Sequence, residues 1–191
     1  MKTSSLTLSV AAFVALSACA GGAPPETRLY TLDYRASEPL PELDGNLSIA
    51  LDRLELAEYL EQPGLTMLEQ QNQIRIATFH IWGEGLTTAV PRALTYDLAK
   101  ACQCPVSDPS TTGIASSADN RIRVRVERFS ATDTSEVVLS GRYLMTDKEG
   151  KQMERYFNLS SDLEQDGYDH AVSKMRDLVS RLAIQIVSEL K

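Results

Sequence analysis

The sequence predicts an α+β fold: a two-layer sandwich in which two amphipathic helices cover one face of a mostly antiparallel sheet. Several segments alternate apolar and polar residues, as half-buried strands do. Two other segments carry an apolar residue at every third or fourth position, which gives each a single apolar stripe. Two such helices can lie side by side on one sheet. The length of 191 residues suits one domain of this kind.

Composition excludes several classes of protein. The formal net charge of −7 offers no basic surface for nucleic acid. Three cysteines are too few for a disulfide scaffold. The one long apolar stretch is N-terminal, so a transmembrane bundle is also excluded.

The N-terminus has the pattern of a bacterial export signal. Lys2 precedes a short apolar run at residues 6–16, too short to span a bilayer. The next residues, Leu16-Ser17-Ala18-Cys19, resemble a lipobox, after which the cysteine becomes the mature N-terminus and carries acyl chains such as palmitate. We expect residues 1–18 to be the signal peptide and Cys19 to be lipidated. The alternative is an ordinary secretory signal with a chance cysteine.

The residues after Cys19 predict a short tether. The segment 19–27 contains Gly21, Gly22, Pro24 and Pro25, which disfavour helix and sheet. Eight flexible residues span roughly 16 Å, which keeps the folded domain, residues 28–191, close to its membrane. In bacterial lipoprotein sorting, an aspartate after the lipidated cysteine usually means retention in the inner membrane. Ala20 occupies this position here, so we expect the protein on the periplasmic face of the outer membrane.

The first half of the domain reads as strands followed by a helix. β-prone or alternating segments predict strands at residues 28–34, 47–52, 65–69 and 73–78, with a bend at 54–60. An apolar stripe predicts a helix that begins between Glu84 and Thr88 and continues to Ala101. Pro91 is tolerated in its first turn, or else kinks the helix. Residues 102–120 read as a long loop, with a short strand near Val106.

The second half reads as a meander followed by a helix. Three alternating segments near residues 121–127, 137–145 and 153–159 are joined by short connections, as in antiparallel strands. Asp166 or Asp169 is expected to cap a final helix of 22 residues. Its apolar stripe comprises Val172, Met175, Leu178, Val179, Leu182, Ile186 and Leu190.

Nothing in the sequence nominates an active site. No phosphate-binding loop, Gly-x-Ser-x-Gly elbow or dinucleotide fingerprint is present. The two histidines, His80 and His170, have no metal-ligand spacing in the expected strand and helix start. We therefore expect no enzyme activity, catalytic residue, metal or cofactor.

Two polar motifs have open interpretations. Cys102 and Cys104 either form a disulfide across a very short loop or remain two structural thiols at a helix end. A basic stripe on one strand is either a solvated face balanced by cross-strand acids or a contact for anionic headgroups or an acidic partner. It comprises Arg121, Arg123, Arg125 and Arg128.

Irregular chain around the only tryptophan is a candidate contact patch. Trp82 stands beside two glycines just before the first helix. It is either a core residue or part of a partner- or lipid-contact surface; we favour the core for Trp82 and the exposed side for Tyr59 and Leu60. The partner-contact candidates are Tyr59, Leu60, Pro63, Trp82, Glu84 and Leu86.

The same residues, in this order, resemble the ABC-type transport auxiliary lipoprotein family, whose members are PqiC-like or YmbA-like. The likeness rests on a lipobox, Tyr-Thr-Leu at 30–32, Tyr-Leu at 59–60 before Pro63, Trp-x-Glu-x-Leu at 82–86, and Val-x-Val-x-Arg-Phe at 124–129. It covers nearly the whole mature chain. The chain departs from the family at Glu61-Gln62, Ile81 and Gly85, which puts contacts of the lost arginines in doubt more than the fold.

The resemblance implies a non-catalytic outer-membrane component of intermembrane lipid transport. Such a lipoprotein docks the periplasmic conduit of a mammalian-cell-entry (MCE) type transport protein at the outer membrane. The family also implies a homo-oligomeric ring. The alternatives are a lipoprotein chaperone or pilotin for another outer-membrane assembly machine, and a periplasmic enzyme with a dispersed site.

Overall fold

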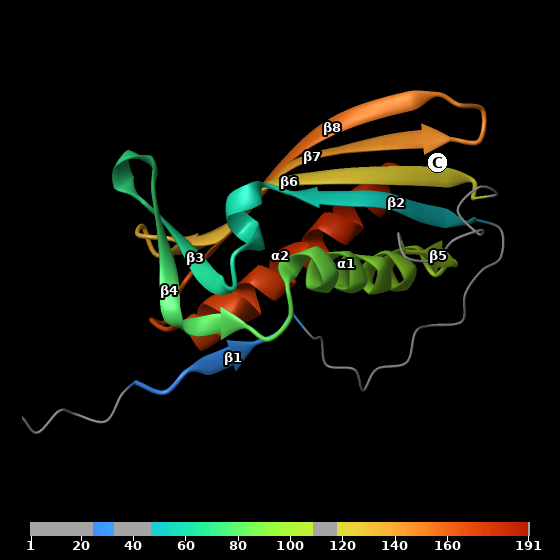
Figure 1. The fold of residues 1–191 in the computed structure, drawn as a ribbon. Helices are drawn as coiled ribbons and strands as arrows, with labels where there is room; N and C mark the ends of the chain where they lie inside the picture. The colour runs from blue at the N-terminus through green and yellow to red at the C-terminus, as the bar shows by residue number, and fades with distance from the viewer. Residues whose placement is uncertain (1–24, 33–46, 109–117, 191) are drawn as a thin grey trace, which may run out of the picture.

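The computed structural model describes residues 25–32, 47–108 and 118–190 (Figure 1). The expected signal peptide, Cys19 and the first part of the tether lie outside the described residues, as do residues 33–34 of the first expected strand.

The elements follow the predicted order, with different boundaries. The expected bend at 54–60 divides between the end of one strand and a 3-10 turn, and the strand expected at 73–78 continues to Trp82. The bounds are β1 (Arg28–Tyr30), β2 (Ile49–Leu56), η1 (Glu58–Glu61), β3 (Gly64–Glu69), η2 (Gln70–Asn72), β4 (Gln73–Trp82), α1 (Leu86–Cys102), β5 (Val106–Ser107), β6 (Asn120–Thr132), β7 (Glu136–Asp147), β8 (Gln152–Asp162) and α2 (Tyr168–Ser188).

One mixed sheet contains all eight described strands, with β6 at its centre. The predicted meander is present, because β6, β7 and β8 pair antiparallel in sequence order. On the other side of β6, β2 pairs in parallel with its first half and β3 with its last two residues. The pairs β1·β4 and β2·β5 are parallel as well. The sheet is therefore mixed, where the sequence predicted mostly antiparallel pairing.

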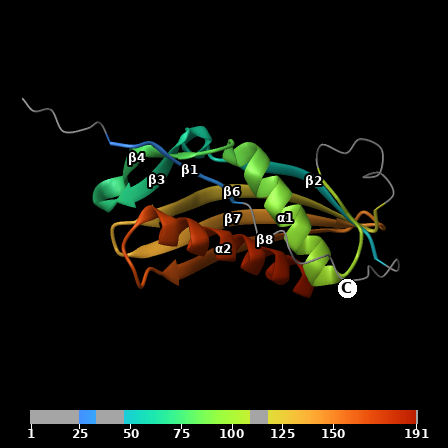
Figure 2. The same ribbon diagram turned by 90° about the horizontal axis from the view of Figure 1, so that it is seen from below.

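Both helices lie against the same face of the strands β2, β6, β7 and β8 (Figures 1 and 2). Alternation in β6 and β7 turns one set of side chains toward them, so that Val124, Val126, Leu139 and Tyr143 are buried. The predicted stripe of α2 is buried against the sheet from Val172 to Ile186. Burial raises the pKa of Tyr143 to about 12, which keeps its hydroxyl protonated.

Two irregular places in the sheet depend on glycine. The register of β6 against β7 shifts between Val126 and Arg128, so the strands approach closely beside Gly141. A Cβ atom at Gly141 would overlap the backbone carbonyl of Arg125, and one at Gly64 would overlap that of Ala77. These positions accept no side chain without a shift of the backbone.

The helix ends differ from the prediction. Neither Asp166 nor Asp169 caps α2, because its N-cap is Gly167 and no side chain bonds there. Asp169 lies in the first turn, where a carboxylate suits the helix dipole, and pairs with Arg28 at 3.5 Å. In α1 the helix begins at Leu86, so Pro91 lies inside it rather than in its first turn.

Candidate functional site

The six predicted contact residues lie close together, where η1, β3 and β4 meet the start of α1, yet half of them are buried. Leu60, Trp82 and Leu86 belong to the hydrophobic core. The preference for Leu60 on the exposed side was therefore wrong: Leu60 of η1 is 1% exposed, and Tyr59 is half-buried and packs against the core.

Trp82 is 6% exposed, in agreement with the core interpretation. It ends β4, and its backbone N–H donates to the carbonyl of Pro63 at 2.8 Å. On the other side it stands in register with Tyr30 of β1. The tryptophan thus closes the core at the point where the chain leaves the sheet for α1.

Glu84 is engaged within the protein. Its two carboxylate oxygens accept hydrogen bonds from the two terminal nitrogens of Arg92 on α1, one of them at 2.8 Å. This bidentate pair fixes the loop before α1 to the second turn of the helix. Of the six candidates, only Pro63 is exposed, while Tyr59 and Glu84 are half-buried.

Tyr59 lines a surface hollow. Its hydroxyl donates to the carbonyl oxygen of Glu127 at 2.9 Å, at the shift in β6. Burial raises the pKa of Tyr59, while the charge of Arg128 opposes this rise, and the hydroxyl remains a donor at neutral pH. The hydrogen bond holds η1 against the sheet.

The hollow lies between η1, the turn of the β3–β4 hairpin and the end of β6, and has a volume of about 390 Å³. It combines apolar side chains of the hairpin with polar and charged ones of β6. The lining residues are Tyr59, Leu68, Glu69, Asn72, Ile74, Glu127, Arg128, Thr132, Asp133 and Thr134.

Beside this hollow, β4 offers an open edge. β1 pairs only with residues 80–82 of β4. Over residues 73–79, β4 pairs with β3 on one side and with no other described strand on the other. An extension of β1 in this register would place Pro25 opposite Ala77, and proline has no N–H to donate. In the described part of the chain, residues 25–27 before β1 form no strand beside this edge.

Large apolar side chains accompany that edge. Ile74 and Phe79 are exposed, and Ile76 is 45% exposed. The hairpin projects from the rest of the sheet, so both of its faces reach solvent (Figure 1). An exposed apolar edge strand is a template for another extended chain. We call residues 73–79 of β4 and the hollow beside Tyr59 the hairpin surface.

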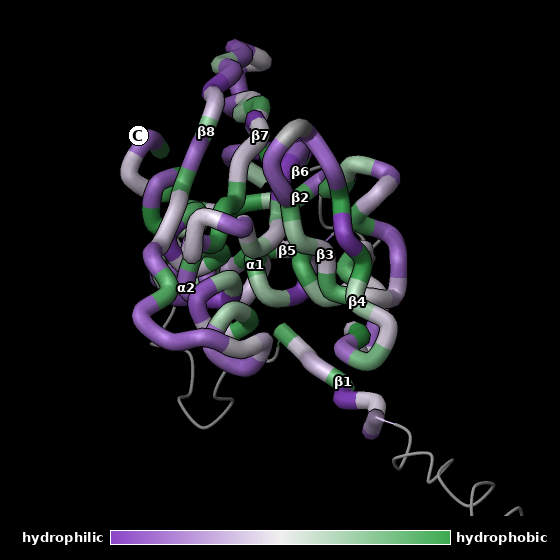
Figure 3. The backbone as a smooth tube through the Cα atoms, turned by 90° about the vertical axis from the view of Figure 1, so that its left-hand side faces the viewer, coloured by the Kyte–Doolittle hydropathy of each residue, from purple (hydrophilic) through white to green (hydrophobic). Residues whose placement is uncertain are grey.

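The opposite edge of the sheet, β8, is protected by comparison. Arg181 of α2 donates to the backbone carbonyl of Ser160 at 2.7 Å, and Arg155 pairs with Glu189 at 3.2 Å. Hydrophilic residues also dominate β8 (Figure 3). Charged side chains on an edge strand oppose pairing with another chain. The hairpin surface is therefore more accessible than the edge formed by β8.

A comparison with known families decides what kind of protein carries this surface. The sequence model of the ABC-type transport auxiliary lipoprotein component matches residues 30–187. The chain belongs to this family. It is 25% identical over 147 residues to the intermembrane transport lipoprotein PqiC of Escherichia coli K12, which covers 77% of this chain and 76% of that protein. PqiC of Shigella flexneri matches with the same figures.

Solved structures share the fold of this auxiliary lipoprotein. A crystal structure of an uncharacterized protein superposes with a TM-score of 0.73 at 22% identity, and covers 87% of this chain and all of its own. Protein XCC0632 from Xanthomonas campestris gives a TM-score of 0.62 at 9% identity, with 84% and 92% coverage. At these identities the likeness concerns the fold alone.

The exposed apolar residues of β4 were not among the predicted contacts of the auxiliary lipoprotein. The alternation of Ile74 and Ile76 was visible in the sequence, but it reads equally well as the buried face of an ordinary strand. Only the position of the turn end of the hairpin, which projects away from both helices, shows that these side chains have no cover (Figures 1 and 2).

The histidines and cysteines have local partners. The ring of His80 lies 2.8 Å from the Tyr30 hydroxyl through Nδ1 and stacks on Tyr168, and His170 contacts Glu164 at 2.9 Å. Among residues 25–32, 47–108 and 118–190, no three His, Cys, Asp or Glu side chains are grouped to hold a metal.

A disulfide joins Cys102 and Cys104 at the end of α1. Neither described helix is long and apolar enough to cross a membrane.

Proposed function

We propose that this auxiliary lipoprotein is a non-catalytic component of an ABC/MCE-type intermembrane lipid transport system, anchored on the periplasmic face of the outer membrane. The observation that carries the proposal is the family match across residues 30–187, almost the whole of the folded domain. The printed name of the curated relatives, intermembrane transport lipoprotein, supports it.

The proposed anchor is the N-terminus. Residues 1–18 act as signal peptide, Cys19 carries the lipid, 19–27 form the tether, and 28–191 form a single domain. The acyl chains on one cysteine bind the membrane strongly, because each buried methylene contributes about 0.8 kcal/mol. The tether then holds the domain within reach of the membrane surface.

The proposed docking region for the MCE-type partner is the hairpin surface. The partner contributes an extended segment that pairs with residues 73–79 of β4 and places apolar side chains near Ile76 and Phe79. Tyr59 and Pro63 border this region and remain contact candidates. Contact through this edge leaves the core of the domain unchanged.

Lipidation is tested by substitution of the cysteine. In Cys19→Ala, we expect incorporation of labelled palmitate to be lost and the protein to accumulate as unprocessed precursor. Ser17→Ala keeps a small residue before the cysteine and should be labelled like the wild type. Equal label in Cys19→Ala and the wild type would rule out the lipid anchor.

Docking is tested by a charge on the open edge. We expect Ile76→Lys to keep its melting temperature within about 2 °C, since exposed substitutions usually change stability by less than about 0.5 kcal/mol. It should lose at least about tenfold in capture of the MCE-type partner from solubilised membranes, because a lysine blocks apolar strand pairing.

Ile184→Lys is the matched control, because Ile184 is an exposed isoleucine on α2 rather than on the hairpin. It should capture the partner normally. Full capture by Ile76→Lys would refute the docking region. A wild-type protein that captures another outer-membrane assembly machine, and no MCE-type protein, would instead support the chaperone or pilotin function. A cross-link at Ile76 between two copies of this chain would instead indicate that this edge forms a contact within the homo-oligomeric ring.

A further inference from the structure

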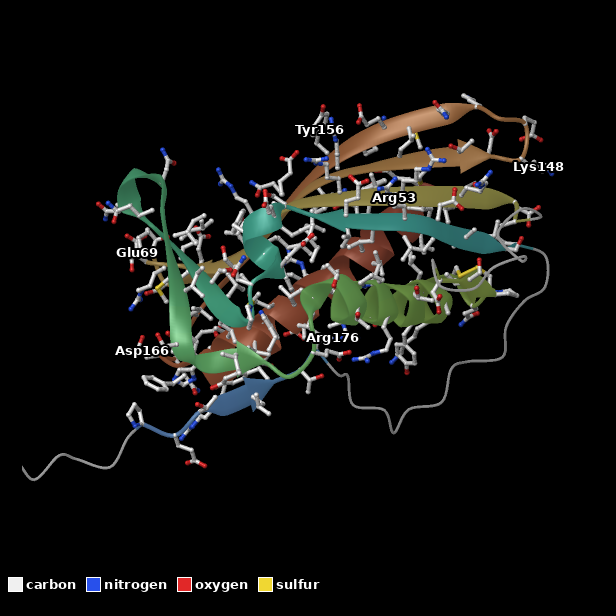
Figure 4. All side chains as sticks on the ribbon, viewed as in Figure 1. Arg53, Glu69, Lys148, Tyr156, Asp166 and Arg176 are labelled. Carbon is white, nitrogen blue, oxygen red and sulfur yellow. A yellow bond between two sulfur atoms is a disulfide. The ribbon has the colours of Figure 1, made fainter. Side chains whose placement is uncertain are left out.

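The face of the sheet turned away from the helices carries five arginines. In β6 and β7 these side chains alternate with buried residues, and Arg53 of β2 stands in register with Arg123, so they point to the open side (Figure 4, where Arg53 is labelled). We call this surface the arginine face. It consists of Arg53, Arg121, Arg123, Arg125 and Arg142.

The arrangement places like charges directly opposite each other. Arg53 stands in register with Arg123, and Arg125 stands in register with Arg142. Like charges at directly opposed positions of neighbouring strands destabilise a sheet. Two such pairs on adjacent strands are a local conflict, and conflicts of this kind occur mainly where a surface has a function.

Carboxylates relieve only part of this repulsion. Asp52 and Glu55 each form ion pairs with two arginines, and Glu154 forms one, so three negative charges face five positive ones. The pairs are Arg121–Asp52 at 2.8 Å, Arg123–Asp52 at 3.7 Å, Arg53–Glu55 at 2.7 Å, Arg125–Glu55 at 3.3 Å and Arg142–Glu154 at 3.6 Å. On a chain with a formal net charge of −7, this face is locally positive.

The arginines surround an open hollow of about 600 Å³, with Leu144 among its lining residues. Tyr156 of β8, which stands in register with Arg142, is 70% exposed (Figure 4). A guanidinium has five N–H donors, more than the single carboxylate paired with each of these arginines engages. Donors therefore remain for an anion with several acceptor oxygens, beside apolar surface.

We propose that the arginine face binds the phosphate group of an anionic phospholipid headgroup. The planar fork of arginine matches phosphate oxygens in pairs, and a phosphate between opposed arginines removes their repulsion. Leu144 and Tyr156 offer apolar surface to the acyl chains of a lipid, which a purely acidic polypeptide lacks. The choice of a lipid as the source of phosphate rests on the proposed function in lipid transport.

The position of the face fits a lipid that is carried rather than one in the anchoring leaflet. β1, which leads back to the tether, lies on the helix side of these strands, and the arginine face is on the other side (Figure 1). The face is thus turned away from β1, the described element nearest to the proposed tether. A phospholipid delivered by the transport system reaches it without competition from the anchor.

The test measures lipid binding by the full lipidated chain in neutral detergent micelles. Titration with dihexanoyl phosphatidylglycerol should show saturable binding, and dihexanoyl phosphatidylcholine should bind more weakly. Arg123→Gln/Arg125→Gln should weaken phosphatidylglycerol binding by about tenfold or more, since each lost arginine removes charge-assisted hydrogen bonds. Both side chains are more than half exposed, so the melting temperature should not fall.

Two comparisons separate a site from general charge. Arg28→Gln/Arg75→Gln removes two exposed arginines elsewhere and should bind the lipid normally. Glu55→Gln removes the carboxylate between Arg53 and Arg125 and should tighten binding about threefold. This gain of affinity cannot result from misfolding.

Several outcomes would overturn the proposal. Binding of phosphatidylglycerol that is unchanged in Arg123→Gln/Arg125→Gln, or equally weakened in the control pair, would exclude a specific site. Equal affinity for inorganic phosphate would indicate a soluble source of phosphate. Tighter binding of polyglutamate than of lipid would indicate an acidic protein as the ligand. The measurement uses the purified chain alone. Its failure is therefore distinguishable from a failure to capture the MCE-type partner.

Discussion

Replacement of Trp82 by alanine is expected to lower the free energy of unfolding by about 3–5 kcal/mol, the usual cost of removing a large aromatic side chain from a core. The ring is buried at the end of β4, and its backbone joins β4 to the turn at Pro63. A cavity there would loosen the junction of β1, β4 and α1. Denaturant unfolding followed by circular dichroism measures the loss.

Tyr156→Ala is the control for this prediction, since it removes another aromatic ring at a position that is exposed on β8. We expect it to change stability by less than about 0.5 kcal/mol. Trp82→Phe should recover part of the loss because it refills some of the cavity. A Trp82→Ala protein as stable as the wild type would contradict the core position of the ring.

The elements that could be predicted from the sequence are those whose burial is decided locally. The stripe of α2 and the alternation of β6 and β7 each depend on one periodic segment that meets one apolar surface. The meander followed because its connections are too short for any pairing other than antiparallel. No knowledge of distant segments was needed at these places.

The parallel pairs needed such knowledge. β2 pairs with β6, which follows it only after the hairpin and α1, and nothing within either strand specifies that neighbour. The same holds for the site. Leu60 and Tyr59 are adjacent in an irregular segment, and only the packing of η1 on the sheet decides which of them is buried. The open edge of β4 likewise depends on where the sheet and helices end.

A polar contact between the two helices was not predicted, because the expectation for the helices rested only on their apolar stripes. Asp97 of α1 is buried and accepts hydrogen bonds from both terminal nitrogens of Arg176 on α2, at 2.6 and 2.8 Å. Ser180 donates to the same carboxylate at 2.9 Å. Figure 4 labels Arg176 on the helix side of the molecule. Together these groups fix the position of α1 along α2 in the layer that supports the sheet.

We expect Asp97→Ala to destabilise the domain by about 3–5 kcal/mol, because it leaves the guanidinium of Arg176 buried without its carboxylate. The apolar pair Asp97→Leu/Arg176→Met should recover most of that loss, since it removes both charges and fills similar volume. Equilibrium unfolding of these variants, and of Asp97→Leu and Arg176→Met alone, completes the double-mutant cycle. If the double variant is no more stable than Asp97→Ala, the contact contributes through packing or backbone position, and an unpaired charge is not the cause. If Asp97→Ala unfolds like the wild type, the carboxylate does not hold the helices together.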